Sequence, residues 1–309
     1  MKAFLGASVM VLAFAFMATA SAEAKPKRAG GKTYVYGLCG PNVCRVDAKT
    51  RRSKIVLRRS TGKEYRAVAA SPSGSTLAFT YDGELFRSGR DGRGRRKLDQ
   101  GGFNPRQVAI SRNGRDVSWF ASINSQQCYY DPISGFPTCY PVVYDYLFRQ
   151  GLSDRESDSL SGNQFTSGWY RGQLIAQVEP DEGTDDYICA LDGEGDCTRT
   201  LASRAGRAYS SPTTSPDGRY LAVVSEPAPP EDGDMDYEGR IEIFNAANGT
   251  HIRNLTTGVK DDTPIFSPDG RSVAFNRGDD VLSRSVRGGR QKLIKRDMTL
   301  TGPSWARGK

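Results

Sequence analysis

Short apolar runs alternate with polar, glycine-containing turns along most of the chain, a pattern that predicts successive β-strands and little helix. The clearest runs follow a Ser-Pro-Asp-Gly turn, within residues 215–223 and 267–275. Looser copies of this turn and strand begin at Ser71 and Ser111, and a degenerate copy occupies residues 168–178. One structural unit therefore recurs along the chain, which indicates a repeat architecture.

The recurring turn predicts the local structure of each unit. Proline pre-sets the first turn dihedral, aspartate or asparagine hydrogen-bonds to the main chain, and glycine accepts a positive φ, so each copy predicts a tight β-hairpin. A shorter pair of strands around a glycine-rich turn follows, as in residues 187–201, which brings the unit to about four strands. The turn glycines recur 38 to 58 residues apart, at Gly74, Gly114, Gly172, Gly218, Gly270 and Gly308.

The two ends of the chain complement each other. Residues 303–309 repeat the strand that leads into the turn, but the chain stops before a second strand. Residues 33–38, 43–47 and 53–57 predict three strands that have no lead-in strand of their own. A sixth unit built from both termini would remove the open edges of the repeated sheets. We therefore predict one all-β domain of six four-stranded units over residues 33–309, closed by pairing of the N-terminal strands with the C-terminal strand.

These Ser-Pro-Asp-Gly units resemble the repeats of TolB-type, WD-repeat-like β-propellers, over essentially all of residues 33–309. The resemblance implies a six-bladed β-propeller, with each unit forming one blade. In this family the propeller is usually a binding platform and sometimes an appendage of an enzyme such as a prolyl-oligopeptidase-type peptidase. The resemblance does not imply one activity, because a fold can host many functions.

The N-terminal segment has the features of a secretory signal. Residues 3–18 form an apolar run after Lys2, and small residues follow, so we predict a signal peptide over residues 1–24. An uncleaved membrane anchor is the competing interpretation, which the short apolar run disfavours. Residues 25–32 predict a flexible basic lead-in, because proline and glycine interrupt them. The expected location is outside the cytoplasm, in the periplasm, the cell envelope or the extracellular space.

The cysteines fall into three close pairs. In an exported chain such pairs predict structural disulfides, and strands of one blade would bring near neighbours together. A metal site is the alternative, but the spacings lack the C-x-x-C pairs that zinc prefers, and we predict neither metal nor cofactor. The predicted bridges are Cys39–Cys44, Cys128–Cys139 and Cys189–Cys197.

The chain carries a formal net charge of +8, with basic clusters in residues 51–63 and 87–97. Such a rim could dock an anionic envelope polymer, phospholipid headgroups in a peripheral association, or an acidic protein. The alternative is that these charges only solvate outer strands and discourage aggregation. Nucleic acid is not an expected partner of an exported chain.

The sequence offers little catalytic chemistry. His251 is the only histidine, it falls in a predicted outer strand, and no G-x-S-x-G nucleophile motif accompanies it. The acidic residues 231–239 miss the glycine and glutamate positions of a calcium loop, which favours an ordinary polar loop. We therefore expect no catalytic residue.

Two candidate binding regions follow from the predicted topology. The longest insertions, residues 123–141, 179–186 and 226–239, fall on the face opposite the motif turns, here called the long-loop face. The first insertion contributes potential aromatic contacts, namely Tyr129, Tyr130, Phe136 and Tyr140; these rings could equally cover the edge of the neighbouring blade.

The second candidate region is the channel mouth. The residues five positions before each motif serine are predicted to lie there: Arg66, Arg106, Gln164, Ser210, Asp262 and Thr301. The two arginines could hold an anionic group or a peptide terminus, although a self-paired, hydrated channel lining is the simpler interpretation.

The leading hypothesis is an exported, monomeric, non-enzymatic scaffold that binds a protein or an anionic envelope polymer through the long-loop face. The alternative is a propeller-fold lyase or hydrolase that acts on an envelope or extracellular polymer at the channel mouth. That alternative requires an acid/base or metal constellation around the predicted channel residues.

Overall fold

The computed structural model describes residues 31–98, 103–130, 137–152, 158–160, 168–178, 186–227, 239–257 and 260–308. For residues 103–104, 122–125, 127, 129–130, 137–145 and 158–160 only the backbone is described. The signal peptide and most of the basic lead-in that the sequence predicts lie outside these residues. Within them, no helix is long and apolar enough to cross a membrane.

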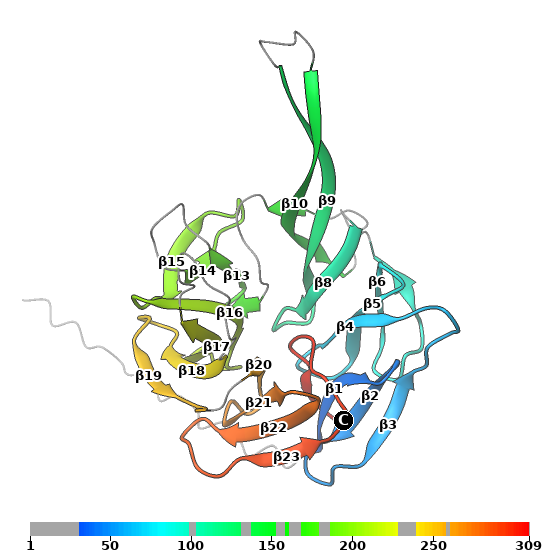
Figure 1. Cartoon of the computed structure of the whole chain (residues 1–309). Helices are drawn as coiled ribbons and strands as arrows, with labels where there is room; N and C mark the ends of the chain where they lie inside the picture. The colour runs from blue at the N-terminus through cyan, green and yellow to red at the C-terminus, as the bar shows by residue number, and fades with distance from the viewer. Residues whose placement is uncertain are drawn as a thin grey trace, which may run out of the picture. The chain divides into compact units, whose positions relative to one another are not determined.

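The described chain forms six sheets of four antiparallel strands that are arranged as a ring, the six-bladed β-propeller that the sequence predicts (Figure 1). Blade 1 consists of β4 (Tyr65–Ala70), β5 (Thr76–Tyr81), β6 (Glu84–Gly89) and β7 (Arg96–Lys97). Blade 2 consists of β8 (Phe103–Ile110), β9 (Asp116–Tyr130), β10 (Pro137–Gly151) and β11 (Asp158–Leu160). Blade 3 consists of β12 (Gly168–Tyr170), β13 (Gln173–Val178), β14 (Tyr187–Leu191) and β15 (Cys197–Ala202).

The remaining blades complete the ring. Blade 4 consists of β16 (Arg207–Thr214), β17 (Tyr220–Pro227), β18 (Arg240–Asn245) and β19 (His251–Asn254). Blade 5 consists of β20 (Asp261–Phe266), β21 (Ser272–Arg277), β22 (Asp280–Ser285) and β23 (Lys292–Lys295). Blade 6 consists of β24 (Trp305–Arg307), β1 (Thr33–Cys39), β2 (Asn42–Asp47) and β3 (Ser53–Leu57).

Blade 6 confirms the predicted closure, because it joins the two ends of the domain. β24 pairs antiparallel with β1, with Trp305 opposite Val35. Just before β24, the Tyr36 amide donates to the Ser304 carbonyl at 2.9 Å, and the buried Ser304 hydroxyl donates to the Tyr36 carbonyl at 2.6 Å. β24 therefore supplies the innermost strand of blade 6, which the N-terminal strands alone would lack.

The motif turns that begin with a serine each form a small box of hydrogen bonds, and these bonds explain which residues the motif contains. In the clearest copy the Ser215 hydroxyl donates to Asp217 at 2.6 Å and accepts from the Tyr220 amide at 2.9 Å. The Gly218 amide closes the turn by donating to the Ser215 carbonyl at 2.8 Å. Burial opposes ionisation of Asp217, but the hydrogen bonds from Ser215 and Arg219 prevail and lower the pKa of Asp217. The serine therefore links the two strands, and the aspartate holds the serine in place.

The motif turns also pack against one another around the ring. Gly74 adopts a φ of +67°, and a Cβ atom there would overlap the carbonyl oxygen of Arg307 in blade 6. At Gly270 of blade 5, a Cβ atom would lie 3.5 Å from Pro216 of blade 4, which is ordinary van der Waals contact. Glycine therefore permits the left-handed turn at both positions, and at Gly74 it also permits the close approach of the neighbouring blade.

The hydrophobic core lies between neighbouring blades. One cluster joins Ala78 and Leu85 of blade 1 to Trp119 and Phe148 of blade 2, whose rings stack with centroids 5.6 Å apart. Another cluster joins Ile265 of blade 5 to the strands of blade 6. Because each sheet packs against the next, no blade can bury its apolar faces alone.

One predicted loop is wrong in an informative way. Residues 123–141 were expected to form an irregular insertion, but β9 and β10 remain paired from Asp116–Gly151 outward to Tyr130–Pro137. Each of these strands has 15 residues, and the hairpin projects beyond the ring (Figure 1). The insertion is rich in tyrosine and β-branched residues, and strand pairing satisfies the backbone groups that an irregular loop would leave to water.

Two of the three predicted disulfides are confirmed, each within one blade. Cys39 bonds Cys44 in blade 6, and Cys189 bonds Cys197 in blade 3. Cys128 lies opposite Cys139 in the β9–β10 register, as a third bridge would require, but the Cys139 side chain lies outside the described residues.

We expect Gly74→Ala to destabilise the ring by at least about 2 kcal/mol, because the new methyl group strains the backbone and overlaps the blade 6 carbonyl. Gly62→Ala is the matched control. Gly62 has a φ of +76° but nothing within 4 Å of its would-be Cβ, so only the backbone cost of about 1 kcal/mol applies. Urea unfolding compares the two variants, and equal losses would contradict a role of Gly74 in contact between blades.

Candidate functional site

The centre of the ring contains two cavities, one on the side of the motif turns and one deeper. The cavity at the motif turns, here called the funnel, has a volume of about 100 Å³ and is lined by residues from all six blades. The deeper cavity has a volume of about 80 Å³. Thr213 and Pro303 line both, so the two cavities follow each other along the channel.

Equivalent positions from every blade form the funnel wall. Each blade contributes one residue of its innermost strand, the strand that leads into the motif turn, and we call it the pre-turn residue. It pairs with the first buried residue of the next strand, as Trp305 does with Val35 and Trp169 with Leu174. The six pre-turn residues are Ala70, Ile110, Trp169, Thr214, Phe266 and Trp305. Because this strand position recurs in every blade, the six side chains together form a largely apolar circle around the funnel.

Two tryptophans dominate this ring. Trp169 belongs to blade 3 and Trp305 to blade 6, which are opposite blades in a ring of six. Both are half-buried, and the buried indole N–H of each makes no hydrogen bond. An indole usually finds a partner for this group, so both N–H groups are buried donors that stay unpaired beside the apolar wall of the funnel.

Arginines add positive charge to the funnel. Arg112 and Arg171 line it from blades 2 and 3, and both are exposed to solvent. The Arg171 guanidinium lies 5.3 Å from the ring centre of Tyr170, a cation–π contact that holds the long side chain against the wall. The funnel can therefore accept an apolar group at its centre and a carboxylate beside it.

Backbone bulges narrow the deeper cavity. Gln107, Ser211 and Thr263 adopt φ values of +49°, +50° and +45°, each where the pairing of the first and second strands shifts. From blade 6, Gly302 comes so close that a Cβ atom would lie 2.6 Å from the Val108 carbonyl oxygen. Non-glycine residues with positive φ carry strain, and three at one level of the channel mark a specialised constriction.

On the long-loop side, the channel residues predicted from the sequence are engaged mainly within their own blades. Arg66 forms an ion pair with Glu64 at 2.6 Å, and the Arg106 guanidinium lies 5.8 Å from the Phe120 ring centre. Thr301 accepts a hydrogen bond from the Val68 amide at 2.9 Å, which ties blade 6 to blade 1. Ser210 is half-buried on β16, and Gln164 lies outside the described residues.

Asp262 has the most perturbed environment among these predicted residues. Its carboxylate accepts from the Asn276 amide at 2.6 Å, and Asn276 also donates to the Leu300 carbonyl at 2.9 Å. Burial raises the pKa of Asp262 although water reaches the residue, and the bond from Asn276 only partly offsets this rise. Burial also raises the pKa of Glu226 in blade 4; Arg207 opposes that rise and the Asp262 charge adds to it. The two carboxylates therefore influence each other across neighbouring blades.

The remaining predicted residues lie elsewhere. The side chains of Tyr129, Tyr130, Phe136 and Tyr140 lie outside the described residues, so their contacts stay a prediction. Among the described residues, no group of three or more His, Cys, Asp or Glu side chains is placed to hold a metal ion.

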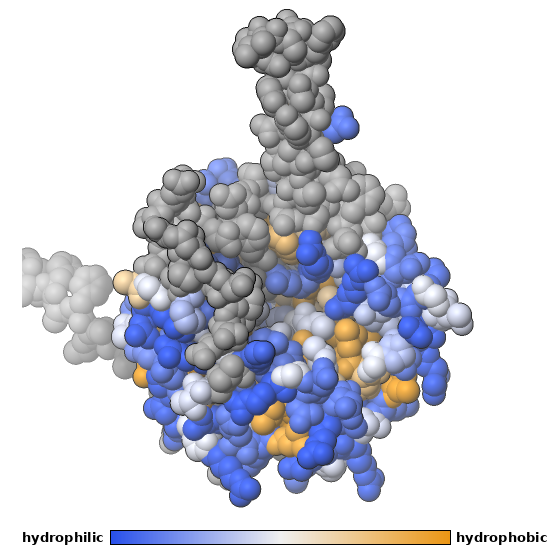
Figure 2. All heavy atoms as spheres, in the orientation of Figure 1, coloured by the Kyte–Doolittle hydropathy of each residue, from blue (hydrophilic) through white to orange (hydrophobic). Residues whose placement is uncertain are grey.

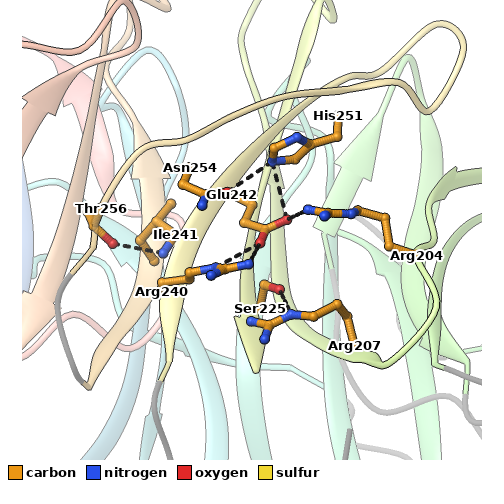
Figure 3. Close-up of polar contacts among 9 residues, drawn as sticks. All are labelled: Arg204, Arg207, Ser225, Arg240, Ile241, Glu242, His251, Asn254 and Thr256. Carbon is orange, nitrogen blue, oxygen red and sulfur yellow. Dashed lines mark hydrogen bonds and ion pairs between the residues drawn. The ribbon is translucent and has the colours of Figure 1, made fainter. Parts of the chain in front are cut away.

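His251 lies on the outer strand β19, as expected, and takes part in a buried charge cluster (Figure 3). The fully buried Glu242 accepts from Arg240 at 2.9 Å and lies 3.4 Å from both Arg204 and His251. The negative charge of a buried carboxylate requires such compensation. Because Arg204 lies just before β16, its ion pair with Glu242 of β18 holds the segment that leads into blade 4 against the third strand of that blade. It is a structural feature of blade 4 and does not line the channel.

Sequence reasoning missed the funnel residues Trp169, Trp305, Arg112 and Arg171. The signal was present in the repeat itself, since aligning the motif copies brings the pre-turn residues into one column. The predicted channel residues lie five positions before the motif serine, toward the long-loop face, whereas the funnel residues lie at the motif turn itself.

No protein-family model and no curated protein matches the sequence of the chain. Solved structures do match its fold. TolB from Acinetobacter baumannii has a TM-score of 0.65 at 19% identity, over 89% of this chain and 66% of the TolB chain. A putative TolB from Agrobacterium tumefaciens has a TM-score of 0.62 at 16% identity, over 90% and 99%. A chain of a nidogen/laminin complex has a TM-score of 0.64 at 14% identity, over 89% and 98%.

These similarities establish the TolB-type six-bladed propeller fold. The chain spans about two thirds of the first TolB and nearly all of the second. Enzymes share the fold as well, since an oligogalacturonate lyase in complex with manganese has a TM-score of 0.52 at 17% identity, over 82% of this chain and 70% of the lyase. At these identities the comparison concerns the fold and leaves the activity open.

We expect Asp262→Asn to raise the free energy of unfolding at pH 7. A carboxyl whose pKa is raised by folding destabilises the folded state when it is ionised, and asparagine avoids ionisation while still accepting from Asn276. The difference should shrink as the pH falls through the raised pKa, because wild-type Asp262 then becomes protonated. Urea unfolding between about pH 4 and pH 8 measures the effect.

Asp91→Asn is the control for this experiment, because it makes the same chemical change at an exposed turn. Its effect should stay within about 0.5 kcal/mol at each pH. A loss of stability in Asp262→Asn at pH 7 would mean that the folded protein requires the ionised carboxylate.

Proposed function

We propose that the protein is an exported, non-enzymatic binding scaffold that holds a segment of a partner protein in the funnel. One observation carries the proposal: six equivalent pre-turn positions converge on one cavity, with Trp169 and Trp305 facing it from opposite blades. A concave, mostly apolar site with a few polar groups is the usual form of a binding site on a rigid scaffold.

The chemistry of the funnel suits a protein segment with an apolar anchor. Buried aromatic residues supply large contact areas at low entropic cost, which makes tryptophan a frequent hot spot of binding. The exposed arginines Arg112 and Arg171 line the funnel and can pair with a carboxylate near the apolar anchor. The nidogen/laminin neighbour, a propeller in a protein complex, supports a protein as the class of partner.

Export is supported by two lines of evidence. The two disulfides are of the kind that persist in oxidising compartments, and TolB-type propellers are the matching fold. The signal peptide predicted over residues 1–24 agrees with this location.

The proposal places protein recognition on the motif-turn side, whereas the sequence hypothesis favoured the long-loop face. The described residues on the long-loop side of the channel are engaged in contacts such as Arg66–Glu64 and Asp262–Asn276. By contrast, the funnel has a mostly apolar wall with two exposed arginines, Arg112 and Arg171. The projecting β9–β10 hairpin remains a candidate second contact on the long-loop face.

An enzymatic role, the alternative considered from the sequence, has weaker support. The oligogalacturonate lyase neighbour is described in complex with manganese. In this chain the described residues bring together no comparable set of metal ligands, and His251 lies on an outer strand beside Glu242. A binding role requires only the funnel residues that are present.

A peptide selection tests the proposal. Binders are selected from a display library of random peptides against the full chain, and affinities are measured by calorimetry. We expect Trp169→Ala and Trp305→Ala each to raise Kd by at least about tenfold, since a tryptophan anchor typically contributes about 2 kcal/mol. Ile252→Ala is the control, because Ile252 is 41% exposed on an outer strand away from the funnel, and it should leave Kd within about twofold.

Selected peptides that bind both tryptophan variants as tightly as wild type would show that the funnel is not the binding site. Circular dichroism and urea unfolding of each variant separate a loss of binding from a loss of fold.

A further inference from the structure

A second recognition surface lies at the outer side of the ring, between blades 5 and 6. A cleft of about 490 Å³ separates the outer strand β3 of blade 6 from the end of β23 in blade 5. On the face shown in Figure 2, hydrophilic residues cover most of the described surface around these strands. We refer to this feature as the inter-blade cleft; its walls come from residues 53–55 and 295–297, Arg58, and the disulfide Cys39–Cys44.

Four basic side chains converge on the inter-blade cleft: Lys54, Arg58, Lys295 and Arg296. Within the described part of the chain, none of the four makes an ion pair or a side-chain hydrogen bond. The only carboxylate in the cleft lining is Asp297. By contrast, Lys63 and Lys97 on blade 1 pair with Asp82 and Glu84 at 2.7 Å. The cleft therefore keeps an uncompensated positive charge, which favours an anionic partner.

The cleft also presents an unpaired strand edge. β3 is the last strand of its sheet and pairs only with β2, so its outer N–H and C=O groups face away from the sheet. Ile55, in the middle of β3, is 37% exposed, and the Cys39–Cys44 disulfide lies beside it in the cleft lining. An open edge with an apolar contact at its centre is the arrangement to which an extended segment can add as a strand.

The outer strand of blade 4 shows that an exposed edge alone does not create such a site. β19 also carries an exposed isoleucine, Ile252, at 41%. Its basic neighbours are engaged, however, because His251 lies 3.4 Å from Glu242 and Arg253 donates to the Arg287 carbonyl at 2.5 Å. Open edge, apolar contact and uncompensated charge coincide at β3 and not at β19.

We propose that the inter-blade cleft binds an extended acidic segment of a partner protein, which adds as a fifth strand to the edge of β3. Main-chain hydrogen bonds to β3 would hold the backbone of the segment. Its carboxylates would pair with Lys54, Arg58, Lys295 and Arg296. Apolar side chains at the alternate positions, on the other face of the added strand, would contact Ile55, which follows Lys54 in β3 and so points to the other face. A membrane surface or a polysaccharide offers charge but no strand backbone, so the free edge favours a polypeptide. This site does not depend on the funnel.

Fluorescence anisotropy with a defined probe tests the proposal. The probe is a labelled peptide of about ten residues with alternating Glu and Val, which presents carboxylates on one face and apolar groups on the other. We expect Lys54→Glu/Arg58→Glu and Lys295→Glu/Arg296→Glu each to weaken binding by at least about tenfold. Arg199→Glu/Arg290→Glu is the matched control, because it makes the same charge change at exposed arginines outside the cleft and should change Kd by less than about twofold.

Two further probes separate strand addition from simple charge attraction. A peptide of the same sequence with methyl groups on alternate amide nitrogens cannot complete a strand ladder, and its binding should be at least about tenfold weaker. The variant Trp169→Ala/Trp305→Ala should bind the unmodified probe with wild-type affinity, since the funnel is a separate site.

Four results would overturn the inference. Equal losses in the cleft and control variants would show non-specific attraction by net charge, and undiminished binding of the methylated probe would exclude strand addition. Cleft-dependent binding of phosphatidylglycerol vesicles or heparin without binding of the peptide would assign the cleft to a membrane or a polymer. Loss of probe binding in the tryptophan double variant would show that the probe binds in the funnel. That result would contradict the cleft proposal but not the proposed function.

Discussion

The structure depends on the pairing of β24 with β1, which converts a row of sheets into a ring. The bonds at this junction are few, and they include the buried pair between Ser304 and Tyr36. Every blade packs its faces against two neighbours, so the core between blades 5 and 6 exists only if blade 6 is assembled from both ends of the chain. Closure therefore couples the first and last strands to the packing of the whole ring, including the central channel.

The motif turn gives this ring its functional centre. The Ser-Asp-Gly box closes the hairpins of blades 4 and 5, and in every blade one residue of the innermost strand lines the funnel. Three of these pre-turn residues, Ala70, Ile110 and Phe266, also belong to the cores between blades. The position varies from blade to blade, from Ala70 to Trp305, so it can adapt the funnel to a ligand without a change in the turn residues.

Much of the fold could be predicted from the sequence because its causes are local. Turn chemistry locates the hairpins, the spacing of Gly74 and Gly270 from their neighbours gives the blade length, and the near cysteine pairs anticipate Cys39–Cys44 and Cys189–Cys197. The incomplete repeats at the two ends predict that the ring closes by pairing of β24 with β1.

The candidate sites depend on contacts between residues far apart in sequence, and these were not predicted. Trp169 and Trp305 become partners only after six blades close, and Lys54 approaches Lys295 only because blade 6 follows blade 5 around the ring. The projecting hairpin was missed for a different reason. Residues 123–141 lack the regular alternation of a buried strand, yet the pairing of residues 123–130 with residues 137–144 satisfies backbone groups of both segments.

The two proposed surfaces differ because they use different parts of a blade. Pre-turn residues lie on the innermost strands, where residues of all six blades meet, so apolar rings such as the buried Phe266 and the half-buried Trp305 are shielded from water there. Outer strands such as β3 keep one edge in water, and lysine and arginine on that edge prevent pairing with a second copy of the same basic strand. The same positive charge attracts an acidic strand, so the feature that protects the edge against self-association also selects its partner. A six-bladed ring can in this way carry an apolar site at its axis and a charged site at its rim without either disturbing the other.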